Sequence, residues 1–190
     1  MSRALVGYRD GELTIDLRTF GEPGTLGVTE ALVVDAATQE DALAAYDAAK
    51  GTNLAATKAK REEVEDWYAA AIAAGWPAEL RDEFDVVVYS PGYTLRIDND
   101  ARNEFDQLAT KWTIKLLGGL DPSTVTTTIY GIDETSSSGN DGGHLVTVDV
   151  FLALIDAGGA YYERLLNLRE SYLQAIASGN ISFTVGDPLS

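Results

Sequence analysis

The longest periodic segment of the chain runs from about Asp149 to Ser178 and predicts one long helix in a chain of 190 residues. Its apolar and small residues recur at alternating three- and four-residue spacings, so they lie on one side of a helix in a heptad-compatible seam. Gly158 and Gly159 weaken the middle of this helix, at a cost of about 1 kcal/mol per glycine relative to alanine. The seam consists of Phe151, Leu154, Gly158, Tyr161, Leu165, Leu168, Tyr172 and Ala175.

A seam of this length has to be covered, and two arrangements would cover it. It can pack within one subunit against a helix predicted at 101–116 and the strands, with Gly158 and Gly159 allowing close approach. It can also form the contact between copies of the chain in a homo-oligomer. The formal net charge of −16 opposes self-association, so contacts between copies would need an apolar centre with acids turned outward.

Composition limits the number of domains and the solubility class of the chain. A hydrophobic content of 45% is enough for one domain with a real core or for two small ones. No apolar run approaches the roughly 18 residues that span a bilayer, and the first residues lack the apolar stretch of a signal peptide. These features predict a soluble chain with no membrane insertion.

Charge and cysteine content exclude several classes of function. The chain has no cysteine, which excludes disulfides, thiolate metal sites and cysteine nucleophiles. Fourteen Lys and Arg residues face thirty Asp and Glu residues, so the average field repels a phosphate backbone. The densest basic run, "KAKREE" at 58–63, lies on a predicted helix and is interpreted as its solvated face. We expect no nucleic-acid partner.

The first 52 residues are predicted to form a β-rich attachment segment with one helix. Alternating residues on both sides of Asp10-Gly11 predict a two-residue hairpin, and "EALVVDA" predicts a further strand. Thr38 is placed as the N-cap of a helix, with Asp41 three residues later, and Gly51 ends that helix.

The next segment, 53–178, is predicted to be an α+β domain. A second helix has an apolar face and ends at Gly75 and Pro77, and "DVVVYSPGYTLRID" predicts two strands joined by a type II turn at Pro91-Gly92. A third helix stops at Gly118-Gly119, and "STVTTTIYGI" and "HLVTVDV" predict two strands around an exposed loop at 133–143. The face of the second helix is formed by Val64, Trp67, Tyr68, Ala71 and Ile72, and the stripe of the third by Ala101, Phe105, Leu108, Trp112 and Leu116.

Residues 179–190 are predicted to form a terminal strand, "ISFTV", and a tail. The fold class expected for the chain is therefore α+β. An N-terminal segment rich in β-hairpins precedes helices that pack on a small, mainly antiparallel sheet.

The acidic run Asp98-Asn99-Asp100 invites a metal-binding interpretation, which the spacing does not support. A calcium loop of the EF-hand type needs glycine at its sixth position and glutamate at its twelfth, where this chain has Asn103 and Ala109. The run directly precedes the first apolar residue of the third helix, where Asp and Asn side chains accept hydrogen bonds from unpaired amides. We interpret it as a helix cap.

No catalytic, cofactor-binding or metal-ligating residue is predicted. His144 is the only histidine, and the nearby Ser136 and Asp141 superficially resemble parts of a catalytic triad. No G-x-S-x-G elbow or strand-to-helix setting for a nucleophile accompanies them. The glycine pairs at 118–119, 142–143 and 158–159 belong to neither of the nucleotide-binding motifs G-x-x-x-x-G-K-[ST] and G-x-G-x-x-G. We therefore expect a protein that is not an enzyme and that holds no cofactor.

The order of segments from 57 to 178 resembles a domain of unassigned biochemical function that recurs in bacteriophage tail-fibre and tail-assembly proteins. The resemblance rests on "KAKREEVEDWYAAAIAAG", on "LRIDNDARNEF" with Asp100-Ala101-Arg102, and on a closing helix between Thr147 and Ile176. It implies a role in the virion, in contact with other tail or baseplate proteins and after assembly in the host cytoplasm. Fibre proteins of that kind are commonly trimeric, so the resemblance favours a homotrimer.

Two classes of function follow. The first is a structural, non-enzymatic component of a phage virion, such as a tail fibre, a fibre adaptor or a baseplate-associated protein. The alternative is an acidic soluble enzyme or a small-ligand binding protein with a site of carboxylates and aromatic residues, for which Trp67, Trp76 and Trp112 are candidate lining residues. The positions of these aromatic residues on helical stripes also fit the hydrophobic core.

Overall fold

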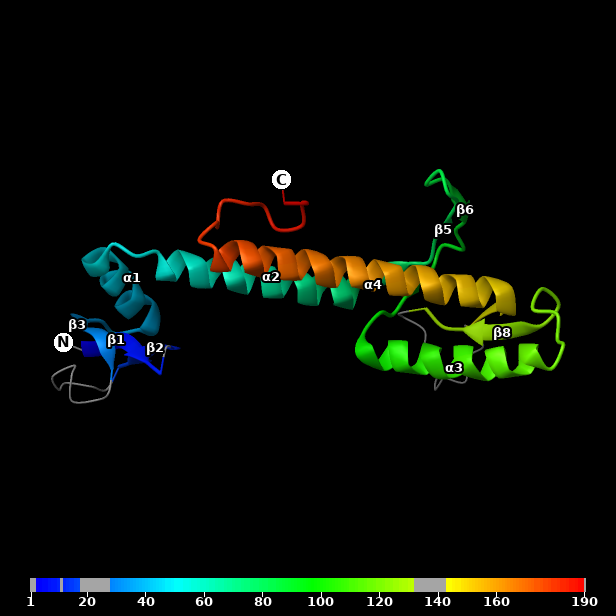
Figure 1. The fold of residues 1–190 in the computed structure, drawn as a ribbon, viewed down its shortest axis with the longest axis horizontal. Helices are drawn as coiled ribbons and strands as arrows, with labels where there is room; N and C mark the ends of the chain where they lie inside the picture. The colour runs from blue at the N-terminus through cyan, green and yellow to red at the C-terminus, as the bar shows by residue number, and fades with distance from the viewer. Residues whose placement is uncertain (1–2, 11, 18–27, 132–142, 190) are drawn as a thin grey trace. The chain divides into compact units, whose positions relative to one another are not determined.

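A computed structural model describes residues 3–10, 12–17, 28–131 and 143–189 (Figure 1). The described elements are helices and small antiparallel sheets, and the fold class is α+β as predicted. The chain contains two compact units: unit 1 comprises Met1–Glu63 with Gln174–Thr184, and unit 2 comprises Val64–Leu173 with Val185–Ser190. The predicted domain division at 52 and 178 stays a prediction, because compact units alone do not show which segments fold independently.

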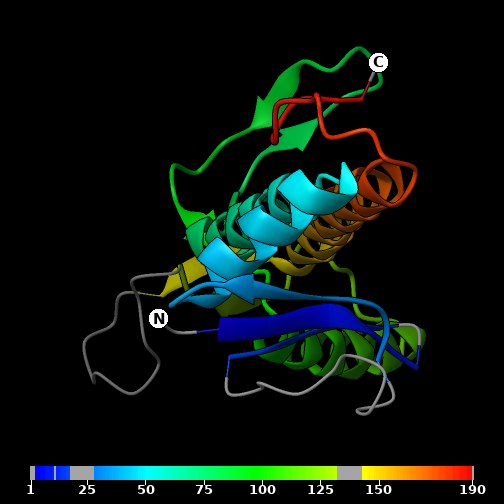
Figure 2. The same cartoon turned by 90° about the vertical axis from the view of Figure 1, so that its left-hand side faces the viewer.

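Unit 1 is built on a three-stranded antiparallel sheet of order β2-β1-β3, formed by Arg3–Arg9, Glu12–Asp16 and Thr29–Asp35. Helix α1 (Gln39–Lys50) covers one face of this sheet (Figure 2). Alternation along the strands directs one set of apolar side chains toward the helix. The buried residues of this core are Ala4, Val6, Val34, Ala36, Ala42 and Tyr46.

The predicted N-terminal hairpin is confirmed by the pairing of β1 with β2, in which Arg9 lies opposite Glu12. Asp10 in the turn has a positive φ of 52°, whereas Gly11 lies outside the described residues. Gly7 allows the chain of β3 to come close, because a Cβ atom there would stand 2.8 Å from the Cα atom of Ala31.

The two helices of the N-terminal half are capped differently. Thr38 accepts a hydrogen bond from the amide of Asp41 and Gly51 takes a left-handed conformation, so both predicted caps of α1 are confirmed. The start of helix α2 (Leu54–Ala74) is capped from a distance by Asp47, a residue of α1. Its carboxylate accepts hydrogen bonds from the amides of Leu54 and Ala55 at 2.9 and 2.7 Å.

Unit 2 contains a long hairpin that corrects the sequence prediction for residues 85–98. Strand β6 (Val87–Tyr89) pairs with β5 (Leu80–Arg81), and β7 (Thr94–Leu95) pairs with β4 (Trp76–Pro77). The two strands predicted on either side of Pro91-Gly92 therefore lie on the same limb of one hairpin. Gly92, in the bend between them, has the positive φ of 83° that the predicted type II turn requires.

The reversal of this hairpin lies at residues 82–86 instead. The carboxylate of Asp82 accepts hydrogen bonds from the amides of Phe84 and Val86, and the amide of Asp82 donates to the carbonyl of Val86. Asp85 takes a positive φ of 62° at the tip. This aspartate-centred turn satisfies the backbone groups of the reversal.

The rest of unit 2 follows the predicted order, with one shift. Helix α3 (Asn99–Leu117) precedes β8 (Thr126–Ile129) and β9 (His144–Thr147), which pair antiparallel. Helix α4 (Val148–Ala177) begins directly after β9, so the strand predicted to continue to Val150 ends at Thr147. The amide of Val148 donates to the carbonyls of Val125 and Pro122, at 2.9 and 3.1 Å, at the point where the ladder ends and the helix begins. Most of the predicted loop at 133–143 lies outside the described residues.

The seam of α4 is covered within the single chain. The helix runs unbroken through Gly158 and Gly159, and none of the eight seam residues is exposed. Phe151, Leu154 and Leu165 belong to the core of unit 2. The buried residues of that core are Trp76, Ala78, Leu95, Ile97, Trp112, Ile129, Val146, Val148, Phe151, Leu154 and Leu165.

The predicted terminal strand is wrong: described residues 181–185 form no strand. Backbone groups of the C-terminal segment instead form hydrogen bonds with side chains of other elements. The ammonium of Lys60 donates to the carbonyl of Phe183 at 3.1 Å. The hydroxyl of Tyr172 donates to the carbonyl of Asp187 and accepts a hydrogen bond from the amide of Gly186. None of the described helices has the length and apolarity that crossing a membrane requires.

Candidate functional site

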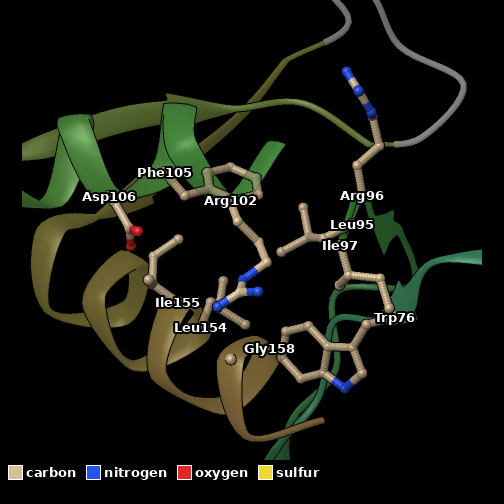
Figure 3. Close-up of a pocket in the computed structure, with 11 residues that line it drawn as sticks. Trp76, Leu95, Arg96, Ile97, Arg102, Phe105, Asp106, Leu154, Ile155 and Gly158 are labelled. Carbon is tan, nitrogen blue, oxygen red and sulfur yellow. The ribbon is translucent and has the colours of Figure 1, made fainter. Parts of the chain in front are cut away.

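Unit 2 contains a pocket of about 460 Å³, including space open to solvent, between the base of the hairpin, α3 and α4 (Figure 3). We call it the Trp76 pocket. Its wall and floor come from three parts of the unit, because β4 and β7 supply one side and the two helices supply the others. It is lined by Trp76, Leu95, Arg96, Ile97, Arg102, Phe105, Asp106, Leu154, Ile155, Gly158 and Gly159.

The shape of the pocket depends on a close approach between Trp76 and α4. A Cβ atom on Gly158 would stand 3.2 Å from Cε3 of the Trp76 ring, so the absence of a side chain at 158 makes room for the indole. A Cβ atom on the adjacent Gly159 would meet nothing within 4 Å. Only the first of the two glycines is thus required by packing.

One cation reaches across the apolar floor of this pocket. Figure 3 shows the Arg102 side chain extending over Leu154 toward Gly158, whereas Arg96 points away. The guanidinium carbon of Arg102 lies 3.9 Å from the centre of the Tyr162 ring, a cation–π contact. Its Nη2 atom is 4.0 Å from a carboxylate oxygen of Glu163. The pocket therefore suits an apolar group that carries a negative charge.

The lining offers no group that could pair a nucleophile with a base. It contains no serine, threonine, cysteine or histidine. Asp106 is the one carboxylate, and Figure 3 shows it at the margin on α3. Catalysis by acyl transfer or by paired carboxylates would need partners that this set of residues does not supply.

The acidic run before α3 is a helix cap, as predicted, and Asp98 is the capping residue. One carboxylate oxygen of Asp98 accepts a hydrogen bond from the amide of Ala101 at 2.9 Å. Arg96 holds both carboxylate oxygens of Asp98, at 2.9 Å each. Partial burial tends to raise the pKa of Asp98, but the hydrogen bonds from Arg96 and Ala101 outweigh it and hold the pKa below its usual value.

Asn99 and Asp100 form the first turn of α3 rather than its cap. The run is thus divided between one capping residue and two helical residues, with the negative charge of Asp100 favoured at a helix N-terminus. Among the described residues, no group of three or more His, Cys, Asp or Glu side chains is placed to hold a metal ion.

His144 is the first residue of β9, paired with Ile129 of β8, which confirms its predicted place at the entry of a strand. Its ring stacks on Tyr93, with ring centres 3.9 Å apart and an interplanar angle of 18°. Ser136 and Asp141 lie outside the described residues, so the structure does not test their proximity to His144.

The other aromatic candidates have packing contacts. Trp112 belongs to the core of unit 2, while the Trp67 ring meets Tyr172 edge to face at 5.7 Å. Burial, together with a hydrogen bond to Tyr162, raises the pKa of Tyr68 to about 12. This phenol therefore stays neutral near pH 7 and is not a general base there. Of the three tryptophans, only Trp76 lines the pocket.

The most unusual surface of unit 2 is the distal part of its hairpin, residues 79–89, which we call the hairpin arm. The arm extends away from α3 and α4 of the same unit in Figure 1 and in Figure 2. Phe84 is 77% exposed, and Val86, Val87 and Val88 are 57%, 40% and 63% exposed. Four consecutive or nearly consecutive apolar side chains thus stand in solvent, an arrangement typical of an interaction surface.

The tip of the arm is held in shape by its charged residues. Arg81 donates to the carbonyl of Asp85 at 3.1 Å and to the carboxylate of Glu79 at 3.0 Å. Sequence reasoning missed this surface. A run of apolar β-branched residues, such as Val86–Val88, is typical of a strand buried on both faces, and only the fold shows that no described segment covers it.

A second set of exposed apolar side chains lies near the C-terminal end of α3 and on β9. Leu117 is the most exposed, at 85%. Unlike the arm, these residues are spread over several elements. The group consists of Ile114, Leu117, Leu120 and Leu145.

Comparison of the chain with protein-family models, with curated proteins and with solved structures finds no match.

Proposed function

We propose that this chain is a non-enzymatic structural component of a bacteriophage virion, of the tail-fibre, fibre-adaptor or baseplate-associated kind, and that it attaches through the hairpin arm to a neighbouring protein of the tail, either a different protein or another copy of the chain. The observation that carries the proposal is the exposure of Phe84 and the three valines on an arm of two short strands. The phage setting comes from the resemblance of residues 57–178 to tail-associated domains.

The energetics of the arm favour a role in binding. Complete burial of a Val or Phe side chain contributes about 1.5–3 kcal/mol, and four such groups remain uncovered on the arm. An isolated two-stranded hairpin is only marginally stable in water. A partner that covers the arm would bury these side chains and stabilise the hairpin at the same time.

The charges around the arm indicate the chemistry of its partner. Between residues 79 and 89 the chain carries four acidic residues and one basic residue, Arg81. The acidic residues are Glu79, Asp82, Glu83 and Asp85. A matching surface has an apolar slot with basic residues at its rim, because complementary potentials select the partner and speed encounter. The side chains of the arm serve as anchors and the acids fix its orientation.

The oligomeric state remains part of the proposal. The seam of α4 is buried or partly buried within one chain, which gives no support to a coiled-coil trimer through this seam. A homo-oligomer would use other surfaces, such as the edge strands β2 and β3 of the described sheet in unit 1, which a neighbouring copy or another tail protein can cover.

The proposal is tested in the phage that encodes the chain. Phe84→Asp with Val88→Asp places two charges on the arm, and Ile114→Asp with Leu117→Asp places two on the other exposed group as a matched control. We expect purified virions to lose the arm variant and to retain the control, as measured by quantitative mass spectrometry. Melting curves of both purified variants establish that they are folded. Absence of the wild-type chain from virions, or equal incorporation of both variants, contradicts the proposal.

A second candidate is a small-ligand binding protein, which the Trp76 pocket favours because Arg102 crosses its apolar floor. The fluorescent anion 1-anilinonaphthalene-8-sulfonate serves as the probe. Saturable binding that is lost in both Arg102→Ala and Gly158→Leu supports this function. Binding that is unchanged in these variants, or absent from the wild-type chain, contradicts it.

A further inference from the structure

Unit 1 contains an open groove between the edge strand β2, helix α1 and the first turns of α2. It encloses about 1020 Å³, including space open to solvent. We call it the β2 groove. It is lined by Leu13, Ile15, Gln39, Leu43, Leu54, Thr57, Lys58 and Arg61.

The floor of the groove is apolar because the core of unit 1 is incompletely covered there. Leu13 and Ile15 lie on the face of the sheet that packs on α1, opposite Tyr8 and Val6 of β1. Both side chains are only partly buried, as is Leu54 at the start of α2. Strand β2 is also an edge strand of the described sheet, the position at which a further strand can pair.

The rim of the groove is basic in a chain whose net charge is −16. Lys58 and Arg61 are both exposed and come from one turn of α2. Lys58 is 3.6 Å from Glu62, whereas Arg61 has no ion pair within the described part of the chain. An occupant with apolar side chains and a surplus of acids would match both the floor and the rim.

The hairpin arm has this chemistry. It presents Phe84 and the valines at 86–88, and between residues 79 and 89 it carries four acids against one arginine. We propose that the β2 groove of one copy takes the hairpin arm of a second copy, with Phe84 and Val88 over Leu13 and Ile15 and the acids toward Lys58 and Arg61. This inference deepens the proposed function and rests on it, since it names the protein that the arm contacts.

The two partners of this contact belong to different units of the chain, so the contact is heterologous. Each copy would donate an arm and accept one, and such contacts propagate as a filament or close into a ring. The general repulsion between copies of charge −16 is opposed locally, where an acidic arm meets a basic rim. The acids and the apolar groups of the arm thus act in the same contact.

A heterologous contact makes a distinctive prediction for mixtures of two defective variants. The arm variant is Phe84→Asp with Val88→Asp, and the groove variant is Lys58→Glu with Arg61→Glu. Light scattering after size exclusion is expected to show a wild-type mass that rises with concentration and a single-chain mass for each variant alone. Their mixture has one intact arm and one intact groove, and is expected to give a species of twice the chain mass and no larger.

Charge reversal provides a second readout that loss of folding cannot imitate. Glu83→Lys with Asp85→Asn makes the arm less acidic while sparing Asp82, which holds the turn. Combined in one chain with the groove variant, these two changes are expected to make self-association at least tenfold tighter than that of the groove variant alone. No restoration, together with no doubling of mass in the mixture above, overturns the inference.

Because the chain has no cysteine, the contact can also be trapped directly. We expect Val87→Cys molecules to form disulfide-linked pairs with Thr57→Cys molecules, at least tenfold faster than with Gln107→Cys molecules, whose cysteine lies on the exposed face of α3. Equal rates for the two pairings contradict the inference.

The outcome is separable from that of the proposed function. If the chain is in virions but its arm cross-links only to a different tail protein, this inference fails and the proposed function stands. If copies associate through arm and groove but the chain is absent from virions, the proposed function fails and the contact stands.

Discussion

The indole of Trp76 lies against Gly158 of α4, so closely that a Cβ atom on the glycine would stand 3.2 Å from Cε3 of the ring. The adjacent Gly159 has no such neighbour within 4 Å. Two glycines that are equivalent in sequence therefore have different physical roles. One admits the indole to the core of unit 2, and the other only lowers the helix propensity.

This difference predicts opposite effects of leucine at the two positions. Gly158→Leu forces the Trp76 ring to move and is expected to lower the free energy of unfolding by about 1–3 kcal/mol. Gly159→Leu replaces a poor helix former by a good one, in space that the structure leaves open, and is expected to raise it by up to about 1 kcal/mol. Urea unfolding of both variants is the measurement. Equal effects would contradict the packing role of Gly158.

The cap of α3 predicts a selective loss of stability at position 98. Asp98→Ala removes the acceptor for the Ala101 amide and the partner of Arg96, and is expected to cost about 0.5–2 kcal/mol. Asp98→Asn keeps a capping oxygen and should cost less, whereas Asp100→Ala leaves the cap in place. Chemical unfolding at pH 7 compares the three variants. A calcium-dependent stability that is lost in Asp98→Ala would refute the capping role.

Asp47 and Asp98 predict the acid sensitivity of the fold. Partial burial tends to raise the pKa of Asp47, but the hydrogen bonds from Ala55, Thr52 and Leu54 outweigh it and lower the pKa. A carboxylate whose pKa is lower in the folded state stabilises the fold above its unfolded pKa of about 3.9. This stabilisation is lost as the pH falls from there through the folded pKa.

The double variant Asp47→Asn with Asp98→Asn is therefore expected to lose less stability than the wild type between pH 4 and the acid limit of folding. Thermal melting across that range is the measurement, with Asp66→Asn, an exposed acid of α2, as the control. An unchanged pH dependence in the double variant would show that other acids dominate.

The hydrogen bonds of the Tyr172 hydroxyl are expected to hold the C-terminal segment in place. Its buried hydroxyl accepts from the Gly186 amide and donates to the Asp187 carbonyl, and Tyr172→Phe removes both hydrogen bonds with little change in volume. We expect the Gly186 amide to exchange with deuterium at least tenfold faster in the variant. Tyr161→Phe serves as the control on the same helix. Exchange that stays slow in Tyr172→Phe would show that other contacts hold the segment.

Local interactions were predictable from the sequence, whereas the interactions between distant segments were not. Thr38, Gly51 and Asp98 act on residues within four positions, and all three helix boundaries were predicted correctly. Asp47 caps α2 from the preceding helix, and nothing in its immediate sequence indicates this. The pairing of Leu80–Arg81 with β6 was missed because two residues are too few to show a strand pattern.

The candidate surfaces were predictable only in part. Trp76 was a candidate lining residue only under the alternative function, with a place in the core as the other interpretation, and it both belongs to the core and lines the pocket. The glycine that makes room for it could be assigned to Trp76 only from the fold. The exposed arm has the sequence of a buried strand. Burial depends on which elements pack over a segment, and the hydrophobic pattern of Val86–Val88 does not contain that information.

Site-specific cross-linking in assembled virions tests the central claim, attachment through the arm, most directly. The chain has no cysteine, so Val88→Cys can carry a single benzophenone maleimide on the arm, with Gln107→Cys as the matched position on α3. After labelled chains are assembled into virions and irradiated, the account predicts covalent adducts with a tail or baseplate protein, or with another copy of the chain, from position 88 and not from position 107. Virions that contain the labelled chain but yield no adduct from position 88, or equal adducts from both positions, would contradict it.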